Sequence, residues 1–398
     1  MMSVSSLMSS EILFVVHDAG ESLAFQPVID IMMKDLNLNM TVLCLGEPST
    51  SIYSNYPNSF VLSDIGIDID IEDGTEDSRA QMLSDAQLGV LVESVQPSIG
   101  ICGMVYGMQA QICSSLRRTI DLPSYSMTFF DGFGLWSNQT VMGTYFTNPN
   151  PEAVRSVMTS AEDQTSAINA EVTEYCTAVT TGNPTLQSWK ATAENETRKH
   201  DTRTYLYGGA AGASTIGVIY AGGYGGDDYT ASLHVFCSTA HDLSTPLESP
   251  RGTKGVFKFV FAPHPGYPSN YEAELFDSWG CLEDILVLST ESGYSTSELV
   301  VASNVSISEC STVGGQSSAV GVPHAYVNAA PGSACNDVFT LNNIIPAASS
   351  SDELQSILST TFNDWNYYVD PTVLEAAGVP INGTGAIMEQ IYGHIRGI

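Results

Sequence analysis

The residues whose types point most clearly to a binding function form a stretch of small residues: Ser311, Thr312, Gly314 and Gly315. They follow an apolar strand predicted to run from Val300 to near Ser308, and a helix is predicted to open near Thr312. Backbone N–H groups at a helix N-terminus and the helix dipole bind anions, and small side chains let a phosphate come close. The stretch therefore predicts a phosphate cradle at the carboxyl end of a strand.

A second glycine-rich loop, residues 221–228, separates a buried strand from a helix. Its glycines Gly222 and Gly223 allow the backbone to approach a pyrophosphate, although a tight turn alone needs only one or two glycines. The pair Asp227 and Asp228 stands where it caps the helix and repels phosphate. His264 follows the next strand, either as a contact for a donor phosphate or as a structural histidine at the end of the sheet.

Three side chains are candidates for general acid–base catalysis. His17 and Glu21 lie in the turn after the first strand, and Asp131 comes directly after the strand over residues 124–130. Imidazole and carboxylate groups take up protons in the transition state, and the carboxyl ends of parallel strands are where such groups gather. These residues are therefore the predicted bases for activating an acceptor hydroxyl.

The elements that position these residues alternate between strands and helices. Strands are predicted over residues 11–16, 40–45, 97–103, 124–130, 216–220, 255–262 and 285–288. Helices are predicted over residues 22–34, 152–176, 186–204 and 229–240. This alternation predicts an α/β protein with parallel sheets, and 398 residues are enough for about two domains. We predict a tail over 1–10, an N-terminal Rossmann-like domain over 11–183 and a C-terminal one over 184–398.

The motifs resemble those of the GT-B fold superfamily, which includes nucleotide-sugar glycosyltransferases and UDP-N-acetylglucosamine 2-epimerases. The resemblance rests on the Ser/Gly turn at 311–315, the exit Gly321-Val322-Pro323, the hinge Thr181-Gly182-Asn183-Pro184 and Pro263-His264-Pro265. It implies two Rossmann-like domains facing each other across a cleft, and a last helix that crosses back onto the first domain. A nucleotide-sugar donor is the one cofactor it implies. Its implied contacts are Gly222, Gly223, His264, Ser311, Thr312, Gly314 and Gln316.

The sequence departs from this family pattern at three places. Gln316 stands where the superfamily usually carries the acidic residue that holds the ribose hydroxyls. The turn that holds His17 and Glu21 has no arginine, and Ala262 and Pro263 precede His264 where several relatives carry a basic residue. These departures predict a degenerate donor site with weak nucleotide-sugar binding.

The charge balance excludes several classes of partner. The chain carries 44 acidic and 13 basic residues, for a formal net charge of −31. Such a chain repels nucleic acid and anionic membranes, and no apolar run is long enough to span a bilayer. The acidic, lysine-poor composition is typical of an extracellular or of a salt-adapted protein. The cysteines favour the first of these, so we predict an extracellular or cell-surface location, although the first ten residues lack the pattern of a signal peptide.

Eight cysteines agree with an oxidising compartment, and Cys310 and Cys335 flank the cradle and could pair. The alternative is that most cysteines are buried small hydrophobes. Their spacing matches no zinc site, so no metal is predicted. Five N-x-S/T sequons are candidate glycosylation sites: Asn39, Asn138, Asn195, Asn304 and Asn382.

Three functions fit these features. The first is a structural or self-assembling surface glycoprotein that keeps the GT-B fold without catalysis, with copies of itself in an oligomer or filament, and glycans, as partners. The second is an active glycosyltransferase that uses a nucleotide-sugar donor. The third is a 2-epimerase-like enzyme, for which Glu21 and Asp131 are the available carboxylates.

Overall fold

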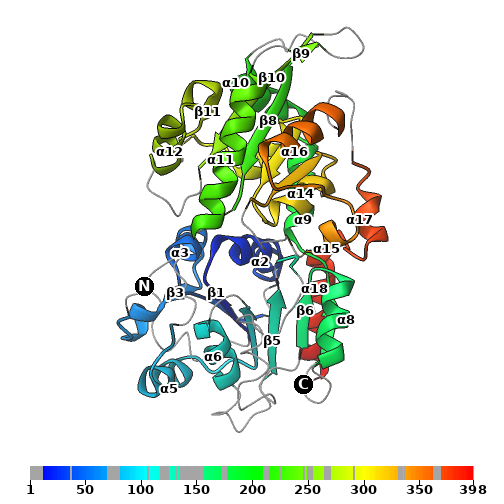
Figure 1. Cartoon of the computed structure of the whole chain (residues 1–398). Helices are drawn as coiled ribbons and strands as arrows, with labels where there is room; N and C mark the ends of the chain where they lie inside the picture. Colours follow the sequence, from blue (N-terminus) through cyan, green and yellow to red (C-terminus); the bar gives the residue numbers. More distant parts are fainter. Residues whose placement is uncertain are drawn as a thin grey trace. The chain divides into compact units, whose positions relative to one another are not determined.

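The chain forms two compact α/β units in a computed structural model (Figure 1). The first unit comprises Met1–Thr185 and Gly378–Ile398, and the second comprises Leu186–Ala377. The structure describes residues 12–35, 38–69, 81–104, 107–116, 125–130, 132–134, 156–171, 177–208, 215–223, 226–244, 247–248, 254–263, 270–289, 292–329, 335, 337–361 and 369–397. Three residues singled out from the sequence, Asp131, Asn138 and His264, lie outside the described residues.

The first unit is built on a parallel sheet of seven strands in the order β3-β2-β1-β4-β5-β6-β7. The strands are β1 (Ile12–Val16), β2 (Met40–Cys44), β3 (Ser59–Val61), β4 (Ile99–Gly103), β5 (Tyr125–Phe130), β6 (Ser156–Thr159) and β7 (Thr177–Thr180). Every residue of β1 is buried, as expected for a strand covered on both faces. The chain adds β2 and β3 on one side of β1, and the later strands, beginning with β4, on the other side. The switch point of the first sheet therefore lies between β1 and β4.

Six helices of the first unit are described: α2 (Ala19–Met32), α3 (Glu47–Tyr53), α5 (Asp85–Ser94), α6 (Gly107–Leu116), α8 (Glu162–Glu171) and α18 (Gly383–Gly397). The 3-10 turn η1 (Leu62–Ile65) follows β3. Phe25 of α2 packs on Phe14 and on Phe129, with 5.4 Å between ring centroids in both pairs. These contacts anchor α2 over the centre of the sheet.

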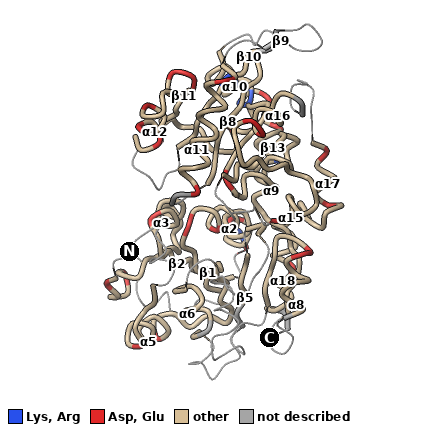
Figure 2. The backbone as a smooth tube through the Cα atoms, in the orientation of Figure 1, with Lys and Arg blue, Asp and Glu red and all other residues tan. Residues whose placement is uncertain are grey.

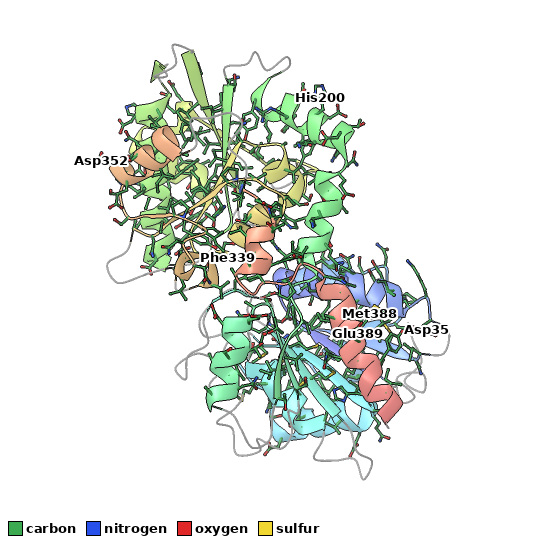
Figure 3. The ribbon with its side chains drawn as sticks, turned by 90° about the vertical axis from the view of Figure 1, so that its right-hand side faces the viewer. Asp35, His200, Phe339, Asp352, Met388 and Glu389 are labelled. Carbon is green, nitrogen blue, oxygen red and sulfur yellow. A yellow bond between two sulfur atoms is a disulfide. The ribbon has the colours of Figure 1, made fainter. Side chains whose placement is uncertain are left out.

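The last helix, α18, packs on this same core. Its residues Ile387 and Ile391 are buried, Met388 is half-buried against the core and Glu389 is exposed (Figure 3). Tyr392 donates a hydrogen bond to Asp35 at 3.3 Å. The predicted range 184–398 for the second domain therefore differs from the structural division, in which residues 378–398 join the first unit.

The second unit repeats the same strand order, β11-β10-β8-β12-β13-β14, and all six strands are parallel. They are β8 (Thr215–Ala221), β10 (Lys254–Ala262), β11 (Ile285–Val287), β12 (Val305–Ser308), β13 (His324–Val327) and β14 (Ala347–Ala348). The short strand β9 (Leu247–Glu248) pairs antiparallel with β10. The switch point of this sheet lies between β8 and β12, which are hydrogen-bonded neighbours.

The helices described in the second unit cover its sheet. They are α9 (Thr185–Ala193), α10 (Glu196–Tyr207), α11 (Gly226–Leu243), α12 (Tyr271–Trp279), α13 (Thr296–Val301), α14 (Val313–Ala319), α15 (Val338–Leu341), α16 (Ser351–Ser356) and α17 (Thr372–Ala376). Phe236 of α11 is fully buried and packs on Tyr220 at 5.1 Å and Phe259 at 5.7 Å between centroids. No described helix of either unit has the length and apolar character required to cross a membrane.

Among the described residues, three disulfides tie neighbouring segments: Cys102–Cys113, Cys237–Cys281 and Cys310–Cys335. The last is the candidate pair from the sequence, in which Cys310 and Cys335 flank the cradle. Cys44 is a buried free thiol, and burial raises its pKa to about 12, so it is protonated at neutral pH.

Removing the Cys237–Cys281 bridge is expected to cost more stability than removing Cys102–Cys113. The two bridges span 44 and 11 residues. Loop-closure entropy gives about 4 kcal/mol for the longer loop and about 3 kcal/mol for the shorter. Thermal unfolding of Cys237→Ala/Cys281→Ala and of Cys102→Ala/Cys113→Ala checks this order. An equal or reversed order would show that local packing, not loop closure, governs the bridges.

Candidate functional site

Two loops meet at the switch point of the second sheet. Gly222 and Gly223 follow β8 with φ of +94° and +98°, a region that glycine adopts without strain. A Cβ atom on Gly222 would lie 2.6 Å from Ser311 Oγ, and one on Gly223 would lie 2.8 Å from Glu309 Cβ. The structure therefore brings Gly222, Gly223 and Ser311 together, and we call the place where these two loops meet the second-unit crevice.

The predicted helix after Ser311 is present as α14, but its glycines serve internal packing. A Cβ atom on Gly314 would lie 2.2 Å from the hydroxyl of Tyr326. That hydroxyl donates a hydrogen bond to the carbonyl oxygen of Ser311 at 3.2 Å. Gln316 is buried within the same helix, whereas Thr312 is half-exposed just before it. Of the predicted donor contacts on this stretch, Ser311 and Thr312 are thus the accessible ones.

A buried polar network lies beneath α14. His324 on β13 is buried, and its ring nitrogens lie 2.7 Å from Ser306 Oγ and 3.0 Å from Ser308 Oγ. Ser306 also donates a hydrogen bond to Ser317 of α14 at 2.8 Å. Burial lowers the pKa of His324 to about 3, so the ring is neutral near pH 7. This network fixes α14 to the two strands below it, and no motif in the sequence indicated it.

Carboxylates give the second-unit crevice an acidic character. The backbone N–H of Glu309 donates to the Tyr220 hydroxyl at 3.1 Å, which holds Glu309 directly after β12. Burial raises the pKa of Tyr220 well above its ordinary value, and the charges of Glu309 and Glu272 raise it further. Glu272 is buried and accepts a hydrogen bond from Tyr229 at 3.2 Å. Glu309 stands between the predicted strand and the predicted cradle, but it is not among the site residues predicted from the sequence.

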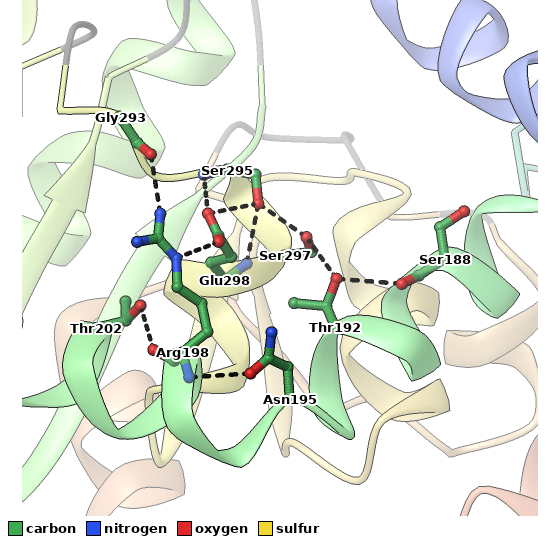
Figure 4. Close-up of polar contacts among 9 residues, drawn as sticks. All are labelled: Ser188, Thr192, Asn195, Arg198, Thr202, Gly293, Ser295, Ser297 and Glu298. Carbon is green, nitrogen blue, oxygen red and sulfur yellow. Dashed lines mark hydrogen bonds and ion pairs between the residues drawn. The ribbon is translucent and has the colours of Figure 1, made fainter.

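The described basic side chains near this sheet are engaged elsewhere. Arg198 pairs with Glu298 at 2.5 Å and reaches the Gly293 carbonyl (Figure 4). Arg203 donates to Asn304 Oδ1 at 2.8 Å, directly before β12, and therefore lies at the amino ends of the strands. Lys258 donates to the Tyr207 carbonyl at 2.7 Å. Asp and Glu, in contrast, are spread over both units (Figure 2). Within the described part of the chain, no guanidinium or ammonium group is recorded in contact with the crevice loops.

Glu21 fills the equivalent switch point of the first sheet. It lies in the first turn of α2, and Asp18 caps that turn by accepting the Glu21 N–H at 3.0 Å. The buried Glu21 carboxylate accepts hydrogen bonds from the His17 backbone N–H and from Gln109 Nε2, the latter at 2.5 Å. A Cβ atom on Gly103, at the end of β4, would lie 1.5 Å from Glu21 Oε2. The structure thus brings His17 and Glu21 together and orients the carboxylate with two donors.

The described sequons differ in how exposed their asparagine side chains are. Asn195 and Asn382 are exposed, and Asn39 is half-buried before β2. Asn304 Oδ1 accepts hydrogen bonds from the Gly217 N–H at 2.9 Å and from Arg203. If the protein is glycosylated, mass spectrometry is expected to find glycan on Asn195 or Asn382 and a bare Asn304. Full occupancy at Asn304 would contradict the packing described around it.

The whole chain is similar to solved structures of nucleotide-sugar enzymes. A putative UDP-N-acetylglucosamine 2-epimerase from Listeria monocytogenes matches with 12% identity over 98% of both chains and a TM-score of 0.64. The Neisseria meningitidis UDP-GlcNAc 2-epimerase bound to UDP-GlcNAc matches with 12% identity over 96% of this chain and 99% of that one, with a TM-score of 0.65. A Rickettsia africae glycosyltransferase matches with 12% identity, covering 97% and 98% of the chains, with a TM-score of 0.57.

No protein-family profile matches the sequence, and no curated protein matches it. At identities near 12%, the structural likeness carries the fold and not the activity. The predicted architecture is confirmed on that basis. The chain has the GT-B-like fold of UDP-GlcNAc 2-epimerases and glycosyltransferases, with two Rossmann-like units built on parallel sheets.

Proposed function

We propose that the protein is a nucleotide-sugar-dependent enzyme of the epimerase or glycosyltransferase type. The observation that carries the proposal is the meeting of the Gly222–Gly223 loop and Ser311 at the switch point of a GT-B-like unit. Ligands of open parallel sheets bind outside the carboxyl ends of the strands at that point. The diphosphate of the donor would approach the glycine backbone, and the hydroxyls of Ser311 and Thr312 would donate to its oxygens.

The acidic crevice sets the conditions under which the donor binds. Glu309 lies beside Gly223, and its charge opposes a diphosphate. A charge-assisted hydrogen bond contributes on the order of 1.5–3 kcal/mol, so the lack of Arg or Lys partners among the described residues weakens metal-free binding. A divalent cation between a carboxylate and the phosphates would offset the repulsion. Mg²⁺ binds through one or two carboxylates together with substrate phosphates in this way.

Calorimetry with UDP-, GDP- and CDP-sugars, each with and without Mg²⁺, tests donor binding. We expect weak binding without metal and a clear gain with Mg²⁺. Glu309→Gln is expected to strengthen metal-free binding about tenfold, because it removes one opposing charge near the phosphates. The control is Glu283→Gln, which removes the same charge from an exposed position just before β11, at the other end of a strand. Absence of binding under every condition would overturn the proposal.

Epimerisation and glycosyl transfer can be distinguished by whether the donor sugar takes up deuterium from the solvent. In deuterated water an epimerase exchanges the proton at the inverted carbon, whereas a glycosyltransferase leaves the donor sugar unlabelled. Glu21 is the proposed base, because its carboxylate is held at the switch point of the first sheet. His17 and Asp131 stay candidates for the same role. Proton NMR of the donor pool, compared between the natural chain and Glu21→Gln, tests both the type and the residue.

A second candidate is a GT-B-like surface component without catalysis that assembles with copies of itself. What supports its lack of catalysis is that Arg203 and Lys258 are engaged with carbonyl and amide oxygens away from the crevice loops. Light scattering of the purified chain tests this candidate. A large regular assembly together with no donor binding would support it, and a monomer or dimer that turns over a nucleotide sugar would exclude it.

A further inference from the structure

A cavity of about 680 Å³ lies on the second unit, apart from the residues of the crevice. One wall is α11, through Thr230, His234 and Ser238. The opposite walls are Trp279 at the end of α12 and the serines that open α16. A volume in the range of about 300–1,000 Å³ is that of small-molecule sites.

The lining of this cavity is unusual for so acidic a chain. None of the ten described residues that line it is Asp, Glu, Lys or Arg, although the chain carries a net charge of −31. Five of the ten carry hydroxyl groups: Thr230, Ser238, Ser349, Ser350 and Ser351. The nearby Glu353 is engaged, since it accepts hydrogen bonds from the Ser349 N–H and hydroxyl, both at 2.7 Å. The lining therefore suits a neutral ligand rich in hydrogen-bonding groups.

An aromatic platform stands in the wall. The Trp279 indole is half-buried, packs on Phe276 at 6.2 Å and meets the His234 ring edge-on at 5.0 Å between centroids. The Cys237–Cys281 disulfide joins α11 to the residue two positions after Trp279. Packing and the disulfide hold the indole in one orientation, so a ligand that stacks on it loses little conformational entropy to the protein.

We propose that this cavity is a carbohydrate-binding site for neutral saccharides, separate from the proposed donor site. The apolar face of a sugar ring would pack on Trp279, while ring hydroxyls would bond with His234 and with the serine and threonine hydroxyls. Tryptophan combines a large apolar contact area with a fixed geometry. Ser238 and Ser349 already donate to the His234 carbonyl and to Glu353, so their hydroxyl oxygens offer acceptor lone pairs to the O–H groups of a sugar. The proposal does not rest on nucleotide-sugar binding, and either can fail alone.

The test measures the binding of maltohexaose, chitohexaose and mannohexaose to the full chain by saturation-transfer NMR and by calorimetry. At least one of these saccharides is expected to bind, with the strongest saturation on the C–H protons of one ring face. Binding is expected to persist when UDP-GlcNAc is present at saturating concentration. No binding of any of the three would overturn the proposal, as would complete displacement by the nucleotide sugar.

Two variants in the cavity and one control test whether the saccharide binds there. Trp279→Ala is expected to weaken binding by at least about tenfold, since the stacking platform is lost. Ala231→Gln keeps a good helix former on α11 and fills the cavity, so it is expected to abolish binding while the melting temperature stays near that of the natural chain. The control is Tyr205→Ala, an exposed aromatic on α10 that does not line the cavity. Unchanged binding in Ala231→Gln would refute the assignment, even if Trp279→Ala failed to fold.

Discussion

Gly103→Ala is expected to destabilise the first unit by about 3 kcal/mol or more. The added methyl group would lie 1.5 Å from Glu21 Oε2 and 2.8 Å from Gln109 Nε2, so the buried carboxylate has to move. Overpacking costs roughly 1–3 kcal/mol, and breaking hydrogen bonds to a buried charge adds on the order of 1–3 kcal/mol. Calorimetric unfolding of the full chain measures the effect as a drop of at least about 6 °C in the melting temperature of this unit.

Gly89→Ala is the matched control for that substitution. Gly89 lies inside α5, and apart from its chain neighbours and the backbone of its own helix no atom lies within 4 Å of the position its Cβ would take. Alanine in an exposed helix interior is expected to stabilise by about 0.5–1 kcal/mol relative to glycine. If both variants changed stability equally, the close approach of Gly103 to Glu21 would be unimportant and the assigned position of the Glu21 carboxylate would be wrong.

His324 is expected to make the second unit acid-sensitive. Its pKa is lowered from an ordinary 6.5 to about 3 in the folded protein, because burial disfavours the charged ring. Between pH 6.5 and about 3 the unfolded chain binds this proton and the folded chain does not. The contribution to stability is therefore fully present above pH 6.5 and decreases by about 1.4 kcal/mol per pH unit as the pH falls through that window.

Denaturant unfolding from pH 7 to pH 4.5 measures this slope. The loss attributable to His324 is about 3 kcal/mol over that range. His324→Gln keeps hydrogen-bonding capacity and removes the titration, so its stability is expected to change less with pH. The control is His241→Gln, because His241 is an exposed histidine that lies 2.9 Å from Asp284. A pH dependence identical in His324→Gln and in the natural chain would rule out the role assigned to His324.

The alternation of strands and helices was predictable because each element carries its own local pattern. Strand β1 is a continuous apolar run, β10 is apolar apart from Lys254, Gly255 and Lys258, and Gly182 marks the hinge with φ of +81°. A Cβ atom on Gly182 would lie 2.3 Å from the Pro380 carbonyl oxygen, so the turn requires glycine there. Local sequence was sufficient in these places because the backbone or the apolar run leaves few alternatives.

Three elements were predicted wrongly where the local pattern conflicted with the tertiary structure. Residues 152–176 were predicted as one helix, yet Ser156–Thr159 form β6 between β5 and β7. The predicted helix over 186–204 is two helices, because Asn195 caps the start of α10 by accepting the Arg198 N–H. The apolar Val300 and Val301 end helix α13 rather than starting a strand. Sheet pairing and capping decided these cases.

The candidate site was predictable only in part. Small residues near Ser311 and Gly222 marked where two loops meet, and the structure brings them together. The same local signal also selected Gly314, whose lack of a side chain instead accommodates Tyr326 from β13. The His324 network depends on the register that sets Ser306 opposite His324 across two strands. That register is a long-range property, so no local pattern could have indicated it.

Hydrogen–deuterium exchange with and without UDP-GlcNAc and Mg²⁺ tests the donor-site proposal most directly. The proposal predicts that the ligand slows exchange in peptides covering Gly222 and Gly223 and in peptides covering Glu309 to Thr312. It also predicts that Glu309→Gln yields the same protection without Mg²⁺. Protection confined to other segments, or none at saturating ligand, would contradict the assignment of the crevice between β8 and β12 as a nucleotide-sugar site.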